Sequence, residues 1–179
     1  MSIFSLRKAT LEDRPALEEL IAESARGLSP PDYTAAQVDA ALGSAFGVDS
    51  ELIRDDTYFV AEAESRIVGC GGWSRRATLF GGDAQPGRRP ELLDPAGDSA
   101  RIRAFFVHPD WARRGIGRAI LEKCESEARA HGFKSAELLA TLPGERFYRA
   151  LGYGGVERIE HRLRDGVTIQ FVPMKKNLA

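Results

Sequence analysis

Hydrophobic and polar positions along the chain follow two different periods, which predicts β-strands interleaved with α-helices. Residues 3–8 partly alternate and predict a first strand, whereas apolar residues three to four positions apart predict a helix over 11–25. A second helix is predicted over 34–45, where Val38 and several alanines share one face. The N-terminal part of the chain therefore predicts one strand followed by two helices.

β-branched and aromatic runs at 57–61 and 67–73, separated by a short polar turn, predict a β-hairpin. A further strand is predicted over 100–107, and it ends before Pro109 because proline cannot donate to a sheet ladder. Between these strands, residues 81–98 are rich in glycine and proline and fit no periodic element. A loop of this length inside a compact domain is either functional or mobile, and the sequence leaves both open.

The C-terminal half continues the alternation of helices and strands. Apolar residues at helical spacing oppose a charged arc over 114–130, which predicts an amphipathic helix that ends at Gly132. This mixture of strands and helices predicts a domain of the α/β class, in its α+β subclass. The remaining predicted elements are a strand over 136–140, a short helix over 144–151, and two strands over 156–163 and 167–174 that meet at an Asp-Gly turn.

Charge and composition then narrow the class of protein. Lys and Arg number 25 against 26 Asp and Glu, a net charge of −1, which argues against a dedicated nucleic-acid binder. No segment approaches the ~20 apolar residues of a membrane span, so we expect a cytoplasmic protein with no membrane partner. Two cysteines, Cys70 and Cys124, and three scattered histidines form no zinc motif, so we expect no metal.

The segment with the clearest chemistry is the turn between the strand at 100–107 and the helix that follows. A helix start leaves backbone N–H groups unpaired and carries about half a positive charge, so it is suited to hold an anion. Gly115 and Gly117 lack the Cβ atoms that would keep phosphate oxygens away, and Arg113, Arg114 and Arg118 add positive charge. The alternative is that Gly117 serves close helix packing and the arginines are solvated.

The pattern does not fit two common phosphate-binding motifs. A P-loop needs Gly-Lys-Ser/Thr, but Gly117 is followed by Arg118 and Ala119. A dinucleotide fingerprint needs a third glycine, and position 120 is Ile120. A nucleotide-dependent oxidoreductase is therefore a distant alternative.

Three pieces together resemble the GNAT superfamily of acyl-CoA-dependent N-acyltransferases. They are the strand over 102–107 with His108-Pro109, the Arg-Arg-Gly-Ile-Gly-Arg turn at 113–118, and the Phe-Tyr-Arg-Ala-Leu-Gly-Tyr segment at 147–153. The resemblance implies a single domain over 1–179 with a mixed, mostly antiparallel sheet flanked by helices. It also implies that the strand near 105–107 splays away from its neighbour.

The resemblance further implies acetyl transfer from acetyl-CoA to a primary amine, by direct attack within a ternary complex. The acceptor would be a small molecule or peptide of unidentified structure, and a homodimer is an option because related proteins often pair. Tyr148 matches the family's tyrosine that protonates the leaving thiolate, the alternative being a packed aromatic residue. The implied cofactor-binding residues are Phe105, Phe106, Val107, Arg113, Arg114, Gly115, Ile116, Gly117, Arg118, Thr141 and Phe147.

The sequence departs from the family pattern at several positions. The family often has Gln or Arg at the position of Ala112, and asparagine at the position of Thr141. The strand that often carries a glutamate base offers only Arg101 and Arg103. The general base therefore stays open between Glu51, Asp98, Glu137 and an ordered water chain. A CoA-binding module without catalysis is the remaining alternative.

Overall fold

A seven-stranded mixed sheet forms the centre of the molecule in the computed structural model, which describes residues 3–179. The strand order is β1-β2-β3-β4-β5-β7-β6, and every neighbouring pair is antiparallel except β4 and β5. The mixed, mostly antiparallel sheet expected from the resemblance is confirmed. The strands are β1 Ser5–Lys8, β2 Tyr58–Ala63, β3 Arg66–Ser74, β4 Ala100–Val107, β5 Ser135–Thr141, β6 Ile159–Arg162 and β7 Thr168–Asn177.

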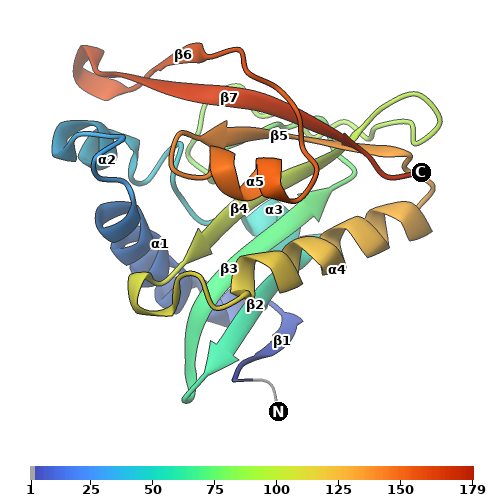
Figure 1. Cartoon of the computed structure of the whole chain (residues 1–179), viewed down its shortest axis with the longest axis horizontal. Coiled ribbons are helices and arrows are strands. Elements are labelled where there is room, and N and C mark those ends of the chain that lie inside the picture. The colour runs from blue at the N-terminus through green and yellow to red at the C-terminus, as the bar shows by residue number, and fades with distance from the viewer. Residues whose placement is uncertain (1–2) are drawn as a thin grey trace.

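Helices cover both faces of this sheet (Figure 1). One hydrophobic core joins α4 and α5 to one face, and a second core joins α1, α2 and α3 to the other face. Among residues 3–179, no helix has the length and apolar content that crossing a bilayer requires. The helices are α1 Arg14–Leu28, α2 Ala35–Ala41, α3 Ser50–Arg54, α4 Ile116–Ala130 and α5 Glu145–Ala150.

Several element boundaries differ from the sequence prediction for local reasons. The second helix stops at Ala41 because Leu42 has an extended backbone. The long amphipathic helix begins at Ile116 and not at 114, because Arg113 and Gly115 both have positive φ angles. Helix α3 was not predicted, since five residues are too few to show helical periodicity.

The long segment between β3 and β4, residues 75–99, is tied to the rest of the molecule, and we call it the β3–β4 insert. Within it, the Ala77 amide donates to the Glu91 carbonyl and the Thr78 amide to the Arg89 carbonyl. Its Asp83 carboxylate accepts hydrogen bonds from both the amide (2.8 Å) and the hydroxyl (2.6 Å) of Ser50, the first residue of α3. The insert is therefore packed over α3.

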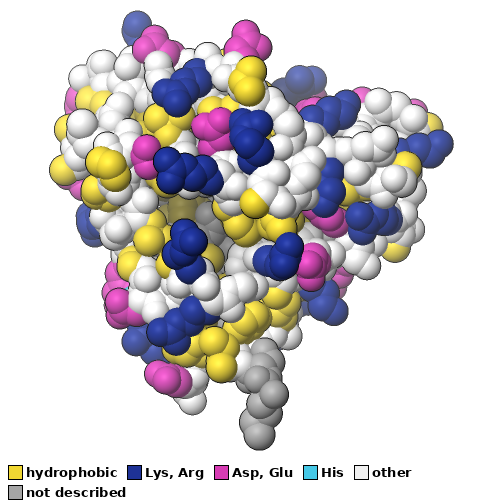
Figure 2. Space-filling view, viewed as in Figure 1, with side chains coloured by type: hydrophobic (Ala, Val, Ile, Leu, Met, Phe, Trp, Pro, Cys, Tyr) yellow, Lys and Arg dark blue, Asp and Glu magenta, His cyan; other side chains and the backbone are white. Residues whose placement is uncertain are grey.

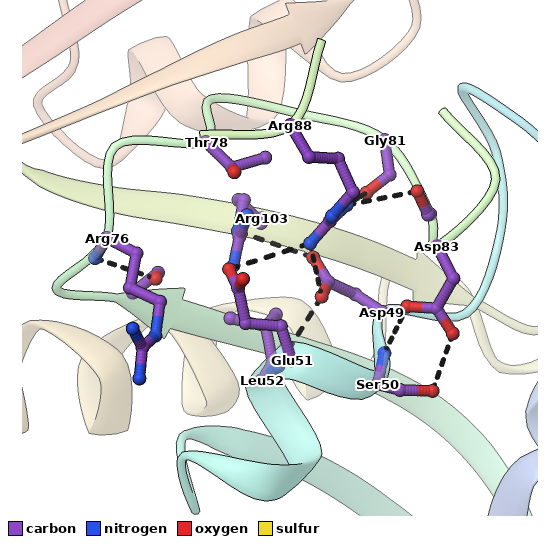
Figure 3. A network of polar contacts seen from close by, with 12 residues as sticks. Asp49, Ser50, Glu51, Leu52, Arg76, Thr78, Gly81, Asp83, Arg88 and Arg103 are labelled. Carbon is purple, nitrogen blue, oxygen red and sulfur yellow. Dashed lines mark hydrogen bonds and ion pairs between the residues drawn. The ribbon is translucent and has the colours of Figure 1, made fainter. Parts of the chain in front are cut away.

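A buried charge network fixes the insert against α3 and β4 (Figure 3). Arg88 of the insert donates to Asp49 Oδ1 at 3.0 Å and to the carbonyls of Gly81 and Gly82. Arg103 of β4 donates to Glu51 at 2.9 Å, and its Nε lies 3.4 Å from Asp49 Oδ2. We call these four charged residues, Asp49, Glu51, Arg88 and Arg103, the insert network.

The two residues at the centre of the insert network are shielded from water. The side chains of Asp49 and Arg103 are both 0% exposed. Burial raises the pKa of the Asp49 carboxyl, and the two facing arginines act in the opposite direction. Asp49 Oδ2 and the Nε and Nη1 atoms of Arg103 form no hydrogen bond with the described residues. Asp49 therefore balances the guanidinium of Arg103 by charge, while the hydrogen bond of that guanidinium goes to Glu51.

Replacing Asp49 tests how strongly the network holds the fold. We expect Asp49→Ala to lower the free energy of unfolding by ~3–5 kcal/mol, because two guanidinium groups lose their buried counter-charge. Urea denaturation measures the change. Asp39→Ala is the matched control, because Asp39 is exposed and its ion pair with the exposed Arg26 is long, at 3.8 Å. Equal midpoints for the two variants would contradict this account.

Candidate functional site

Strands β4 and β5 separate after two residue pairs, which leaves a gap in the middle of the sheet. Only Ala100 with Ala136 and Arg101 with Glu137 are paired. Beyond them, Ala104 has a φ of 60°, and the register between β3 and β4 shifts between Cys70 and Gly72. A bulge of this kind bends the strand that carries it, so β4 turns away from β5. The splay implied by the resemblance is present.

The end of β4 is open on both faces of the sheet, although β4 is the central strand. Residues 104–107 are all half-buried. Phe105 and Val107 pack with the α4/α5 core, whereas Ala104 and Phe106 pack with the core under α1 and α2. Figure 2 shows a hollow on the side that carries α5 and the start of α4, with Lys and Arg side chains around it. The end of β4 therefore presents partly exposed side chains to both faces of the sheet.

The first turn of α4 leaves backbone amides unpaired next to this gap. Gly115 precedes the helix with a φ of 86°, a conformation that glycine adopts without steric cost, and no side chain caps the helix. The amide of Ala119 donates to the Gly115 carbonyl, while the amides of Ile116, Gly117 and Arg118 have no partner among the described residues. This helix start can hold an anion.

The two glycines of the turn have different structural roles. Nothing lies within 4 Å of a Cβ built on Gly115, so its requirement is the positive φ angle. A Cβ built on Gly117 would lie 3.0 Å from Cζ of Phe147, so this glycine lets the α5 ring pack against α4. The close-packing alternative for Gly117 is therefore supported by a contact, which sequence spacing alone could not reveal.

Three exposed arginines surround the helix start. The guanidinium of Arg114 lies 4.7 Å from the centre of the Trp111 ring, a cation–π contact that holds it near the turn. Arg113 is exposed, and Arg118 lies 3.8 Å from Glu122. Arg118 also lines a cavity of about 410 Å³, together with Leu121, Glu122, Glu125, Ala150, Leu151, Gly152 and Lys176.

Tyr148 lies on α5 beside the gap, on the α4/α5 face. Its ring centre is 6.2 Å from that of Phe105, 4.9 Å from Phe147 and 5.9 Å from Tyr153. Burial raises the pKa of its phenol well above the usual value, so the hydroxyl keeps its proton across the physiological range. No described residue forms a hydrogen bond with that hydroxyl, which leaves it available to a ligand.

Two other residues of the expected cofactor site already have protein partners. The Thr141 hydroxyl, at the end of β5, accepts a hydrogen bond from the Gly144 amide at 3.1 Å, just before α5 begins. The Val107 amide donates to the Ser24 hydroxyl of α1 at 3.2 Å. Ser24 therefore covers one of the backbone groups of β4, and sequence spacing gives no signal for this contact.

Each carboxylate considered as a general base has a partner within the protein. Glu51 belongs to the insert network, where Arg103 and Arg88 lie 2.9 and 3.5 Å away. Glu137 forms an ion pair with Arg101, and Asp98 accepts a hydrogen bond from the Asp94 amide at 2.8 Å. The structure brings none of the three to the gap as a free base.

Solved structures of N-acetyltransferases share this fold along nearly the whole chain. A GCN5-related N-acetyltransferase from Rhodopseudomonas palustris has a TM-score of 0.71 and 21% identity, covering 99% of this chain and 97% of that one. The PaiA N-acetyltransferase from Thermoplasma acidophilum, solved with coenzyme A, has a TM-score of 0.65 and 15% identity, covering 99% of both chains. Ard1 from Thermoplasma volcanium has a TM-score of 0.62 and 16% identity, again covering 99% of both chains.

Sequence comparison gives the family directly. No curated protein matches the chain at a significant level. A family model described as the acetyltransferase (GNAT) domain matches residues 54–154, which run from the last residue of α3 past α5 and include the gap and the turn before α4. These are more than half of the 179 residues. The chain belongs to the GNAT family of acetyltransferases.

Proposed function

We propose that the protein transfers an acetyl group from acetyl-CoA to a primary amine by direct attack within a ternary complex. The observation that carries this proposal is the gap between β4 and β5, where half-buried side chains of β4 face both sides of the sheet. The thioester enters from the α4/α5 face and the amine from the α1/α2 face. The protein then acts mainly by holding the two reactants together in reactive geometry.

The CoA diphosphate would bind at the first turn of α4. Unpaired amides at 116–118 and the positive end of the helix attract an anion, and Arg113, Arg114 and Arg118 add charge. The pantetheine arm would then run past Phe147 and Thr141 and along β4 at Phe105, Phe106 and Val107. A related fold in the PaiA structure holds coenzyme A, which supports this assignment.

The chemical step forms a C–N bond and breaks the C–S bond of the thioester. The amine nitrogen attacks the carbonyl carbon, CoA leaves as a thiolate, and the substituted nitrogen loses a proton. A free thiol has a pKa near ~8.5, below that of the buried phenol of Tyr148. The Tyr148 hydroxyl therefore first stabilises the departing sulfur as a hydrogen-bond donor. It then passes its proton to the sulfur as negative charge builds there, and the phenolate that results regains a proton from water.

We assign no carboxylate as the general base. Either water removes the proton from the amine, or the acceptor binds as the neutral amine and the proton lost after attack passes to water. The three candidate carboxylates are engaged by Arg103, by Arg101 and by a backbone amide, which weakens each as a base. We also propose a single domain over 1–179 in a cytoplasmic protein that can form a homodimer. We propose no metal, membrane or nucleic-acid partner for it.

Reversing two charges at the start of α4 tests the diphosphate site. We expect Arg113→Glu with Arg114→Glu to weaken CoA binding about 10²-fold, because two charge-assisted contacts become repulsive. Titration calorimetry with CoA measures the affinity. Arg158→Glu with Arg162→Glu is the control, because it changes the net charge equally at exposed positions around β6. If the two double variants bind CoA equally well, the site lies elsewhere.

Removing the Tyr148 hydroxyl tests whether it acts as the general acid. We expect Tyr148→Phe to lower kcat about 10- to 100-fold with little change in thermal stability, because the hydroxyl has no partner within the described chain. Stopped assays of thiol release measure kcat. Tyr153→Phe is the matched control in the same ring cluster, where the hydroxyl donates to Glu125 at 3.1 Å. It should lower stability and leave kcat within about twofold; an unchanged kcat in Tyr148→Phe assigns that ring to packing.

A further inference from the structure

The α1/α2 side of the gap has a wall of half-buried apolar side chains. Ala104 and Phe106 come from β4, and Leu139 comes from β5. Leu142 packs against both hydrophobic cores, which places it where the two faces of the gap meet. The fifth side chain, Phe80, comes from the β3–β4 insert. We call these five residues the acceptor wall, because the proposed amine must approach the gap from this side.

Aromatic rings continue the acceptor wall away from β4. The Phe106 ring lies edge-on to Phe46 at 6.0 Å, and Phe46 lies 6.5 Å from Phe171 of β7. Phe80 lies 5.7 Å from Phe171 and packs edge-on against His161 of β6 at 4.9 Å. Phe80 is the end of this series of rings, so the insert contributes a half-buried ring to the apolar cluster on this face.

Two polar side chains in contact with these rings, Tyr33 and His161, have partners within the protein. The hydroxyl of Tyr33 donates to the Gln170 carbonyl and accepts from the Leu142 amide. His161 lies 3.3 Å from the Gln85 amide nitrogen, and burial lowers the pKa of its imidazole, so it is neutral at physiological pH.

The four charged groups of the insert network are paired with one another. Arg103 and Asp49 have no exposed surface, and Arg88 and Glu51 are engaged in the same network. The two arginines balance the two carboxylates, so the insert network carries no net charge. The insert network therefore offers an acceptor no unpaired charge.

We propose that the acceptor carries its primary amine on an aromatic or bulky apolar group, and that Phe80 is a specificity-determining residue for it. This inference rests on the proposed acetyl transfer and names the acceptor class. The apolar group would pack between Phe80, Phe106 and Leu142, which removes its surface from water. A second charge on the acceptor would be desolvated there without a partner, which disfavours diamines and acidic amines.

Binding and turnover of matched amines test the acceptor class. The probes are 2-phenylethylamine, propylamine and 1,4-diaminobutane, and a short peptide amide with an N-terminal phenylalanine separates a free arylalkylamine from a peptide source. We expect CoA-saturated protein to bind 2-phenylethylamine at least ~10-fold more tightly than either aliphatic amine in calorimetry. With acetyl-CoA, kcat/KM should follow the same order.

The variant Phe80→Ala tests the residue. We expect it to lower kcat/KM for 2-phenylethylamine about 10- to 50-fold, with a change below threefold for propylamine and for the KM of acetyl-CoA. Phe80→Leu should fall between the two, because it keeps apolar volume and loses the ring. Leu92→Ala, at a position of the same insert that is 65% exposed, is the control and should change none of these values.

The outcomes separate the two proposals. Tighter binding of 1,4-diaminobutane, or an equal loss for all amines in Phe80→Ala, overturns the acceptor class, and a preference for the diamine points to the carboxylates of the insert network. Absence of thiol release with every amine, despite selective binding of 2-phenylethylamine, overturns acetyl transfer and leaves the apolar acceptor site supported.

Discussion

The separation of β4 from β5 after two residue pairs is the constraint on which the site depends. A central strand normally has both edges hydrogen-bonded and both faces covered. Here the bulge at Ala104 turns four residues out of that arrangement, and each keeps partial exposure. Because side chains alternate along a strand, this short segment presents side chains to both faces of the sheet. Helix α4 and the Tyr148 ring then complete one side, and the insert completes the other.

The insert network explains how such an opening is kept in shape. Arg103 stands one residue before the bulge, and its guanidinium faces carboxylates from the segment that begins α3. Arg88 brings the insert to the same carboxylates. Burying four charges is costly in itself, so the network adds less to net stability than to a defined position of β4 relative to its cover.

Much of the fold was readable from the sequence, because strands and the long helix have strong periods and their turns carry Gly, Pro or Asp-Gly. The turn before α4 was also readable, since its glycines and arginines are contiguous. The contact of Phe147 with Gly117 and the pairing of Asp49 with Arg103 join residues far apart in sequence, where no spacing rule applies. Helix α3 was missed because a single turn has no repeat.

The place where the insert joins the sheet has a consequence for how this enzyme could diversify. The insert follows β3 and precedes β4. Its hydrogen bonds and ion pairs hold it to α1 and to the start of α3, and its Leu93 packs against the α4/α5 core. On the proposed function, substitutions in this one segment would change the surface that the amine meets, whereas the first turn of α4, the proposed diphosphate site, would stay as it is. On the same proposal, acceptor preference can change through substitutions in the insert alone.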